Sequence, residues 1–149
     1  MLFRSLNHGH TVRAMVRDPG RVMAAFSPLG IDQDAVEVVR GDVLEPETVA
    51  AALDGCQAAV HAGSVYTLDP QRHDDIRRTN VAGTEIVLRL ASERGLDPII
   101  HVSSTVAYSG ERGTVITPET APNWPDGVYA RSKADSDRLA RSFKNVARR

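Results

Sequence analysis

Apolar residues recur with two different spacings along this chain, and segments with one spacing alternate with segments that have the other. Short runs rich in β-branched residues and bounded by turn-forming residues are typical of buried strands. They predict four strands, at residues 11–16, 35–39, 58–61 and 98–103. Longer segments with apolar residues every three or four positions are typical of amphipathic helices. They predict helices at residues 1–8, 21–26, 46–53, 74–93 and 128–147.

Turn-forming residues agree with these boundaries. Gly9, Gly55 and Gly95 follow three of the predicted helices, where glycine readily adopts the left-handed conformation that ends a helix. Pro46 falls in the first turn of another helix, a position that tolerates proline because no N–H is needed there. The Gly- and Pro-rich stretch at 109–127 predicts a long loop before the last helix.

Strands that alternate with helices at this spacing predict βαβ units, a parallel sheet and a doubly wound α/β fold. In such sheets ligands bind beyond the carboxyl ends of the strands. Polar residues stand at those ends: Arg17, Asp42, Ser64, and Ser103 with Ser104. Their shared position makes this edge of the sheet the candidate ligand site.

Composition narrows the function classes. The 149 residues suit one domain, and 18 basic and 19 acidic residues give a net charge of −1, which disfavours nucleic acid or an anionic membrane as partner. The single cysteine, Cys56, excludes an internal disulfide and a cysteine-based zinc cluster. Because no apolar run is long enough to span a bilayer, we expect a cytoplasmic protein with no membrane partner.

Tyr129 and Lys133 are spaced four residues apart at the start of the last predicted helix. Residues at this spacing share one helix face, and an ammonium beside a phenol favours the phenolate. Tyr129 could then donate and accept a proton in a carbonyl/alcohol couple. Many solvent-facing helices carry this pair by chance, so the pair alone is weak evidence for a catalytic role. The alternating strands and helices that precede it strengthen that interpretation.

Six segments, taken in order, resemble the extended short-chain dehydrogenase/reductases, the NAD(P)-dependent epimerase/dehydratase family, and most of all its dihydroflavonol-reductase-like branch. The segments are Val12–Asp18, Gly41–Val43, Val60–Ser64, Thr79–Thr84, His101–Thr105 and Tyr129–Lys133. The resemblance implies hydride transfer between nicotinamide and a ketone, alcohol or sugar carbon. It does not distinguish a reductase from an epimerase or a dehydratase.

The resemblance also implies the catalytic roles. Tyr129 would be the acid/base, Lys133 would bind the nicotinamide ribose, and Ser104 would hydrogen-bond the substrate oxygen, with Thr105 as the alternative to Ser104. The competing interpretation is a surface Tyr/Lys pair and a serine-rich strand end with no catalytic role.

Cofactor-binding roles follow from the same resemblance. Asp42 and Val43 would seat the adenine, although Asp42 could instead be a turn or helix-capping residue. Ala62, Gly63 and Ser64 would let the backbone approach the ribose and diphosphate, since small residues avoid a clash there. Asn80 would brace the active-site strand and helix, and His61 is expected to be a packed structural residue.

Arg17 bears on the choice of nicotinamide cofactor. At the end of this strand an acidic residue normally binds the adenosine ribose of NAD, whereas an arginine suits the 2′-phosphate of NADP. We therefore expect NADP, with NAD as the alternative because Asp18 follows immediately.

The chain also departs from the family pattern. It has no Gly-x-x-Gly-x-x-Gly turn after a first strand, so residues 1–149 are expected to be a partial Rossmann domain lacking the first strand, the Gly-rich turn and the C-terminal substrate lobe. The strands at 11–16 and 58–61 would flank a gap, which predicts marginal stability. The alternative function is an inactive truncated product that associates through this open sheet, and a homodimer is one such assembly.

Overall fold

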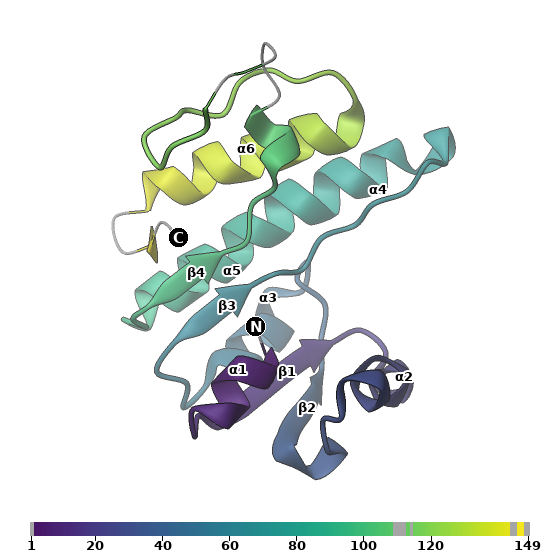
Figure 1. Ribbon diagram of the computed structural model, residues 1–149, viewed down its shortest axis with the longest axis vertical. Helices are drawn as coiled ribbons and strands as arrows, with labels where there is room; N and C mark the ends of the chain where they lie inside the picture. Colours follow the sequence, from purple (N-terminus) through teal and green to yellow (C-terminus); the bar gives the residue numbers. More distant parts are fainter. Residues whose placement is uncertain (1, 109–112, 114, 144–145, 148–149) are drawn as a thin grey trace. The chain divides into compact units, whose positions relative to one another are not determined.

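The computed structural model describes residues 2–108, 113, 115–143 and 146–147. The chain forms two compact units, Met1–Ala52 and Leu53–Arg149, and each is described by itself. The strand pairs in both units are parallel, as the alternation of strands and helices predicts. Figure 1 shows the order of the elements along the chain.

The first unit is built on two parallel strands. β1 (Val12–Val16) pairs with β2 (Val36–Arg40), Val12 lying opposite Val36. α1 (Leu2–Asn7) precedes β1, and α2 (Val22–Phe26) lies on the crossover between the strands. The left-handed backbone of Gly9, at φ 77°, ends α1 as expected.

The end of β2 is closely packed. A Cβ at Gly41 would lie 2.7 Å from the Sδ atom of Met15, so a larger residue there would require the Met15 side chain to shift. α3 (Pro46–Leu53) follows, with Pro46 at its first position and Val49 buried. Arg13 Nη1 donates to the carbonyl of Ala52 at 3.1 Å, which ties β1 to the end of this helix.

The second unit has a three-stranded parallel sheet in the order β3-β4-β5. β3 (Ala59–His61) and β4 (Ile99–His101) were predicted. β5 (Val146–Ala147) was not, because the sequence predicted helix through residue 147. α6 (Val128–Ser142) ends earlier, where Phe143 adopts extended backbone at φ −84° and ψ 124°. Pairing with β4 thus overrides the helical spacing of the apolar residues.

The helix predicted at 74–93 is confirmed as one continuous helical segment with an irregular centre. α4 (His73–Arg77) passes through a π-helical turn at Arg78–Ala82 into α5 (Gly83–Glu93). Figure 1 shows this segment as one long helix with α6 packed along it. The core of the unit lies between the strands and these helices: Ala59, Leu88, Ala91, Leu96, Ile99 and Ala140.

Candidate functional site

Asn80, in the π-helical turn, is the centre of a buried polar network. It is 2% exposed. Its Oδ1 accepts hydrogen bonds from the Ser64 hydroxyl at 3.2 Å and the Val65 amide at 2.7 Å. Its Nδ2 donates to the Val65 carbonyl at 3.0 Å and to Ser132 Oγ at 2.9 Å. The side chain therefore uses both its donor hydrogens and both its acceptor positions.

The backbone carbonyl of Asn80 is bonded as fully as its side chain. It accepts from Thr84 Oγ1 and from Ser136 Oγ, each at 2.6 Å. Ser132 Oγ in turn donates to the Tyr129 carbonyl at 2.7 Å. Two serines one turn apart on α6 thus fasten the start of that helix to the π-helical turn. π-helical turns occur frequently at functional sites.

Lys133 reaches from α6 to the end of β4. Its side chain is buried, at 4% exposure, and Nζ donates to the carbonyl of Val102 at 2.9 Å. Burial lowers the pKa of Lys133, and the negative charge of Asp137 acts in the opposite direction. The ammonium therefore lies at the strand end that the sequence identified.

Ser104 follows that strand end directly. Its carbonyl accepts from the amide of Ala107 at 3.0 Å and so begins the short 3-10 helix Thr105–Tyr108. The amide of Val102 donates to the carbonyl of His61 at 2.9 Å, which joins the ends of β3 and β4. Ser104 is partly exposed and lies two residues after the carbonyl that Lys133 binds.

Tyr129 lies in the first turn of α6 with its ring against Tyr66. The two rings meet edge to face, with centroids 5.0 Å apart and planes at 79°. Tyr66 is 63% exposed and Tyr129 partly exposed. Within the described residues, no hydrogen bond joins the Tyr129 hydroxyl to Ser104 or Lys133, although all three belong to the same unit.

Two buried histidines stack at the ends of β3 and β4. The rings of His61 and His101 lie 5.6 Å apart, and His61 Nε2 is 3.0 Å from Thr84 Oγ1. His61 is therefore a packed residue, as the sequence predicted. Burial lowers its pKa to about 3, with His101 and Lys133 adding to the effect. Burial likewise lowers the pKa of His101 to about 4, and neither of its ring nitrogens has a hydrogen-bond partner among the described residues.

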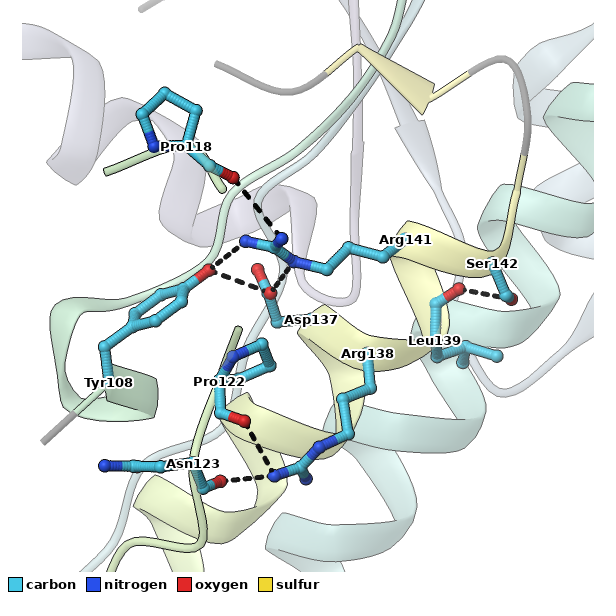
Figure 2. Close-up of polar contacts among 9 residues, drawn as sticks. All are labelled: Tyr108, Pro118, Pro122, Asn123, Asp137, Arg138, Leu139, Arg141 and Ser142. Carbon is cyan, nitrogen blue, oxygen red and sulfur yellow. Dashed lines mark hydrogen bonds and ion pairs between the residues drawn. The ribbon is translucent and has the colours of Figure 1, made fainter. Parts of the chain in front are cut away.

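A second polar cluster lies further along α6, and Figure 2 shows it. Asp137 Oδ2 accepts from Arg141 Nε at 2.7 Å and from the Tyr108 hydroxyl at 2.8 Å. Arg141 Nη2 also donates to the Tyr108 oxygen at 3.0 Å. Burial alone would raise the pKa of Asp137, but these hydrogen bonds outweigh it and leave the pKa lowered. No local pattern in the sequence indicates this cluster.

The loop after β3 carries the small residues expected to approach the cofactor. Ala62, Gly63 and Ser64 are exposed and have no regular secondary structure. Of these, Ser64 is joined to the network through Asn80.

Arg17, Asp42 and Val43 belong to the first unit. Arg17 is exposed at the end of β1. The carboxylate of Asp18 accepts from the amide of Gly20 and so caps the turn that follows.

Asp42 forms a turn of its own. Its Oδ1 accepts from the Leu44 amide at 3.0 Å, and its amide donates to Thr48 Oγ1 at 3.1 Å. This is the turn role that the sequence left open as an alternative to adenine binding. Val43 beside it is half-buried.

Comparison with known proteins agrees with this fold. A family model described as NAD(P)H-binding matches residues 2–145. The dTDP-glucose 4,6-dehydratase of Streptomyces antibioticus is 35% identical over 115 residues, which are 75% of this chain and 34% of that protein. A putative dihydroflavonol 4-reductase of Synechocystis is 30% identical over 108 residues, 72% of this chain and 29% of that protein.

A solved structure gives the same result. The dTDP-glucose 4,6-dehydratase of Streptomyces venezuelae, a double mutant with NAD bound, matches with a TM-score of 0.76 and 27% identity, over 94% of this chain and 46% of that one. The chain therefore belongs to the NAD(P)H-binding family, among the extended short-chain dehydrogenase/reductases of the epimerase/dehydratase type.

The chain spans about a third of the length of the curated relatives it matches. Within the described residues, no helix combines the length and the apolar character needed to cross a membrane.

Proposed function

We propose that the chain provides the nicotinamide-binding and proton-transfer residues of an oxidoreductase or epimerase that acts on a ketone, an alcohol or a sugar carbon. The bound nicotinamide would supply or accept the hydride. One observation carries the proposal: the buried ammonium of Lys133 is fixed on the Val102 carbonyl at 2.9 Å, at the strand end that leads to Ser104. This contact joins two of the family's ordered motifs, His101–Thr105 and Tyr129–Lys133.

Each of three residues would have one task. Tyr129 would give or take the proton at the substrate oxygen, because a hydride gained or lost at carbon needs a matched proton transfer at oxygen. Ser104 would donate a hydrogen bond to that same oxygen. An ammonium has three donor hydrogens, so the contact with Val102 leaves Lys133 two for the ribose hydroxyls.

The remaining predicted residues would hold the cofactor. Ala62, Gly63 and Ser64 offer exposed backbone, and Asn80 fixes that loop to α6 through Ser132. In the first unit Asp42 and Val43 would contact the adenine. We propose these contacts on the basis of the family resemblance. The turn role of Asp42 is compatible with them, because its bond to the Leu44 amide uses Oδ1 and not Oδ2.

The proposal predicts that NADPH binds and that Lys133→Met weakens its binding. Loss of two hydrogen bonds from a charged donor, at about 1.5 kcal/mol or more each, corresponds to a dissociation constant raised roughly a hundredfold or more. Isothermal titration calorimetry on both proteins measures this change directly. Arg89→Gln, at an exposed ion pair on α5, is the matched loss of a positive charge and should bind as the wild type does. Equal affinity in wild type and Lys133→Met would contradict the assigned role.

We further propose NADP rather than NAD as the preferred cofactor. Arg17 is exposed, whereas one carboxylate oxygen of Asp18 is already bonded to the amide of Gly20. Arg17→Ala is expected to weaken NADPH binding about tenfold while leaving NADH binding within about twofold, because only NADPH carries the 2′-phosphate. The same calorimetry with both cofactors measures the ratio of the NADPH and NADH dissociation constants. Tighter binding of NADH by the wild type would reverse the assignment.

An inactive product that associates through open strand edges is the second candidate. Among the described residues, β1 has β2 as its one strand neighbour, and β3 has β4 as its one strand neighbour. Val60 in β3 is 49% exposed. An added strand could bind such an edge by β-augmentation. Light scattering that finds a monodisperse monomer would remove this candidate.

A further inference from the structure

The segment that carries Ser104 is attached to α6 at both of its ends. At one end, Lys133 Nζ donates to the carbonyl of Val102 at 2.9 Å. At the other end, the Tyr108 hydroxyl donates to Asp137 Oδ2 at 2.8 Å. Lys133 and Asp137 are one turn apart on α6, so both attachments come from one helix face. Ser104 lies between them.

The attachment at the far end is a closed triangle of three side chains, which we call the clasp: Tyr108, Asp137 and Arg141 (Figure 2). Each member is bonded to the other two, at 2.7, 2.8 and 3.0 Å. Arg141 Nη1 also donates to the carbonyl of Pro118 at 3.4 Å. Asp137 is 7% exposed, so its charge depends on these partners.

Stability alone is a weak explanation for such a cluster. A buried ion pair often stabilises a protein no better than apolar residues of similar volume, because both charges lose their hydration. A closed triangle of short hydrogen bonds fixes the relative positions of its three side chains, because each bond restricts both a distance and an angle. The clasp fixes where Tyr108 lies along α6, and through the 3-10 helix Thr105–Tyr108 it fixes where Ser104 lies.

We infer that the clasp is a positioning device that holds Ser104 in register with the first turns of α6, which carry Tyr129 and Lys133. This inference rests on the proposed function, because Ser104 has a catalytic role only there. Tyr108, Asp137 and Arg141 act through the backbone of residues 102–108 and are positioning residues rather than catalytic ones.

Amide hydrogen exchange measured by NMR tests the clasp without any cofactor. The amide of Ala107 donates to the carbonyl of Ser104 at 3.0 Å and reports on the clasped end. In Tyr108→Phe and Asp137→Asn we expect this amide to exchange about tenfold faster. The amide of Val102, at the end held by Lys133, should keep its wild-type rate. Asp135→Asn removes the same charge from an ion pair with Arg138 and should change neither.

A second measurement separates positioning from support of the fold. We expect Tyr108→Phe to bind NADPH within about threefold of the wild-type affinity, because the clasp touches none of the proposed cofactor contacts. The change that NADPH binding causes in the Ser104 amide resonance should nevertheless differ between this variant and the wild type. A structural role alone would leave that NADPH-induced change the same in a folded variant.

Three results decide the matter. An unchanged Ala107 exchange rate in folded Tyr108→Phe would overturn the inference, and this conservative variant decides the question if Asp137→Asn does not fold. Acceleration spread evenly over α5 and α6 would also overturn it, because the clasp would then serve stability only. Failure of the wild type to bind NADPH would refute the proposed function, while the exchange rates would still test the clasp.

Discussion

Asn80→Ala is expected to lower the free energy of unfolding by about 3 to 5 kcal/mol. The substitution removes four side-chain hydrogen bonds at once. Both backbone groups of the half-buried Val65 lose a partner, and so does the hydroxyl of the buried Ser132. Each buried polar group left without a partner costs about 1 to 3 kcal/mol, and the missing amide also leaves a cavity. Urea denaturation followed by circular dichroism measures the loss.

Gln71→Ala is the matched control, because it deletes an exposed side-chain amide in the same unit. It should change the free energy of unfolding by no more than about 0.5 kcal/mol. If Asn80→Ala lost less than about 1 kcal/mol, the network would not be fastening α6 to the π-helical turn.

The effect of Asn80 extends from stability to the site. Its side chain joins the loop after β3, which holds Ser64, to Ser132 on α6, next to Lys133. A protein without this link lacks one of the contacts that hold its proposed cofactor loop to its proposed proton-transfer helix. Proposed catalytic groups must stay within a fraction of an ångström of a working geometry, so Asn80 connects folding with the proposed chemistry.

The fold was largely predictable because strand and helix periods depend on local residue types. All four predicted strands are confirmed, with boundaries shifted by one or two residues. The end of α6 was not predictable in this way. Leu139, Phe143 and Val146 keep helical spacing, yet the chain leaves the helix after Ser142 and pairs with β4. Pairing between residues far apart in sequence leaves no mark on local periodicity.

The site was predictable only in part, for a similar reason. Helical spacing indicates that Tyr129 and Lys133 share a face, and the resemblance singles out Asn80. Neither the spacing nor the resemblance indicates which residues pack against that helix face. Ser132 and Ser136 are weak helix formers one turn apart inside a helix, which is the one local sign that they bond to something else. The hydrogen bond that Tyr108 donates to Asp137 joins residues 29 positions apart, so no local pattern in the sequence indicates it.

Acidification is expected to unfold the second unit through its stacked histidines. The pKa of His61 is lowered from 6.5 to about 3 and that of His101 from 6.5 to about 4, mainly by burial. In the unfolded chain both take up a proton near pH 6.5, whereas in the folded chain both stay neutral. Between these pKa values the unfolded chain binds more protons than the folded chain. The free energy of unfolding therefore decreases as the pH falls from about 6.5 toward about 4.

The expected loss is large compared with the stability of an ordinary domain. One pKa unit corresponds to about 1.4 kcal/mol. The two histidines together therefore lower the free energy of unfolding by roughly 4 to 6 kcal/mol between pH 7 and pH 4. Small domains have only about 5 to 15 kcal/mol in total. Urea denaturation at half-unit steps from pH 7 to pH 4 should show the free energy of unfolding falling most steeply between about pH 6 and pH 4.5.

His101→Phe isolates this contribution from the carboxylates that titrate at lower pH. Phenylalanine keeps an aromatic ring against His61 and adds no polar atom, and the ring nitrogens that it removes have no partner among the described residues. The variant should therefore fold at pH 7 and lose about half of the pH dependence, because one of the two buried titrating rings is gone. His8→Phe, at an exposed position, should keep the wild-type slope. A wild-type slope in His101→Phe would mean that other groups cause the acid sensitivity and that the histidine pair is not the pH-sensitive element of this fold.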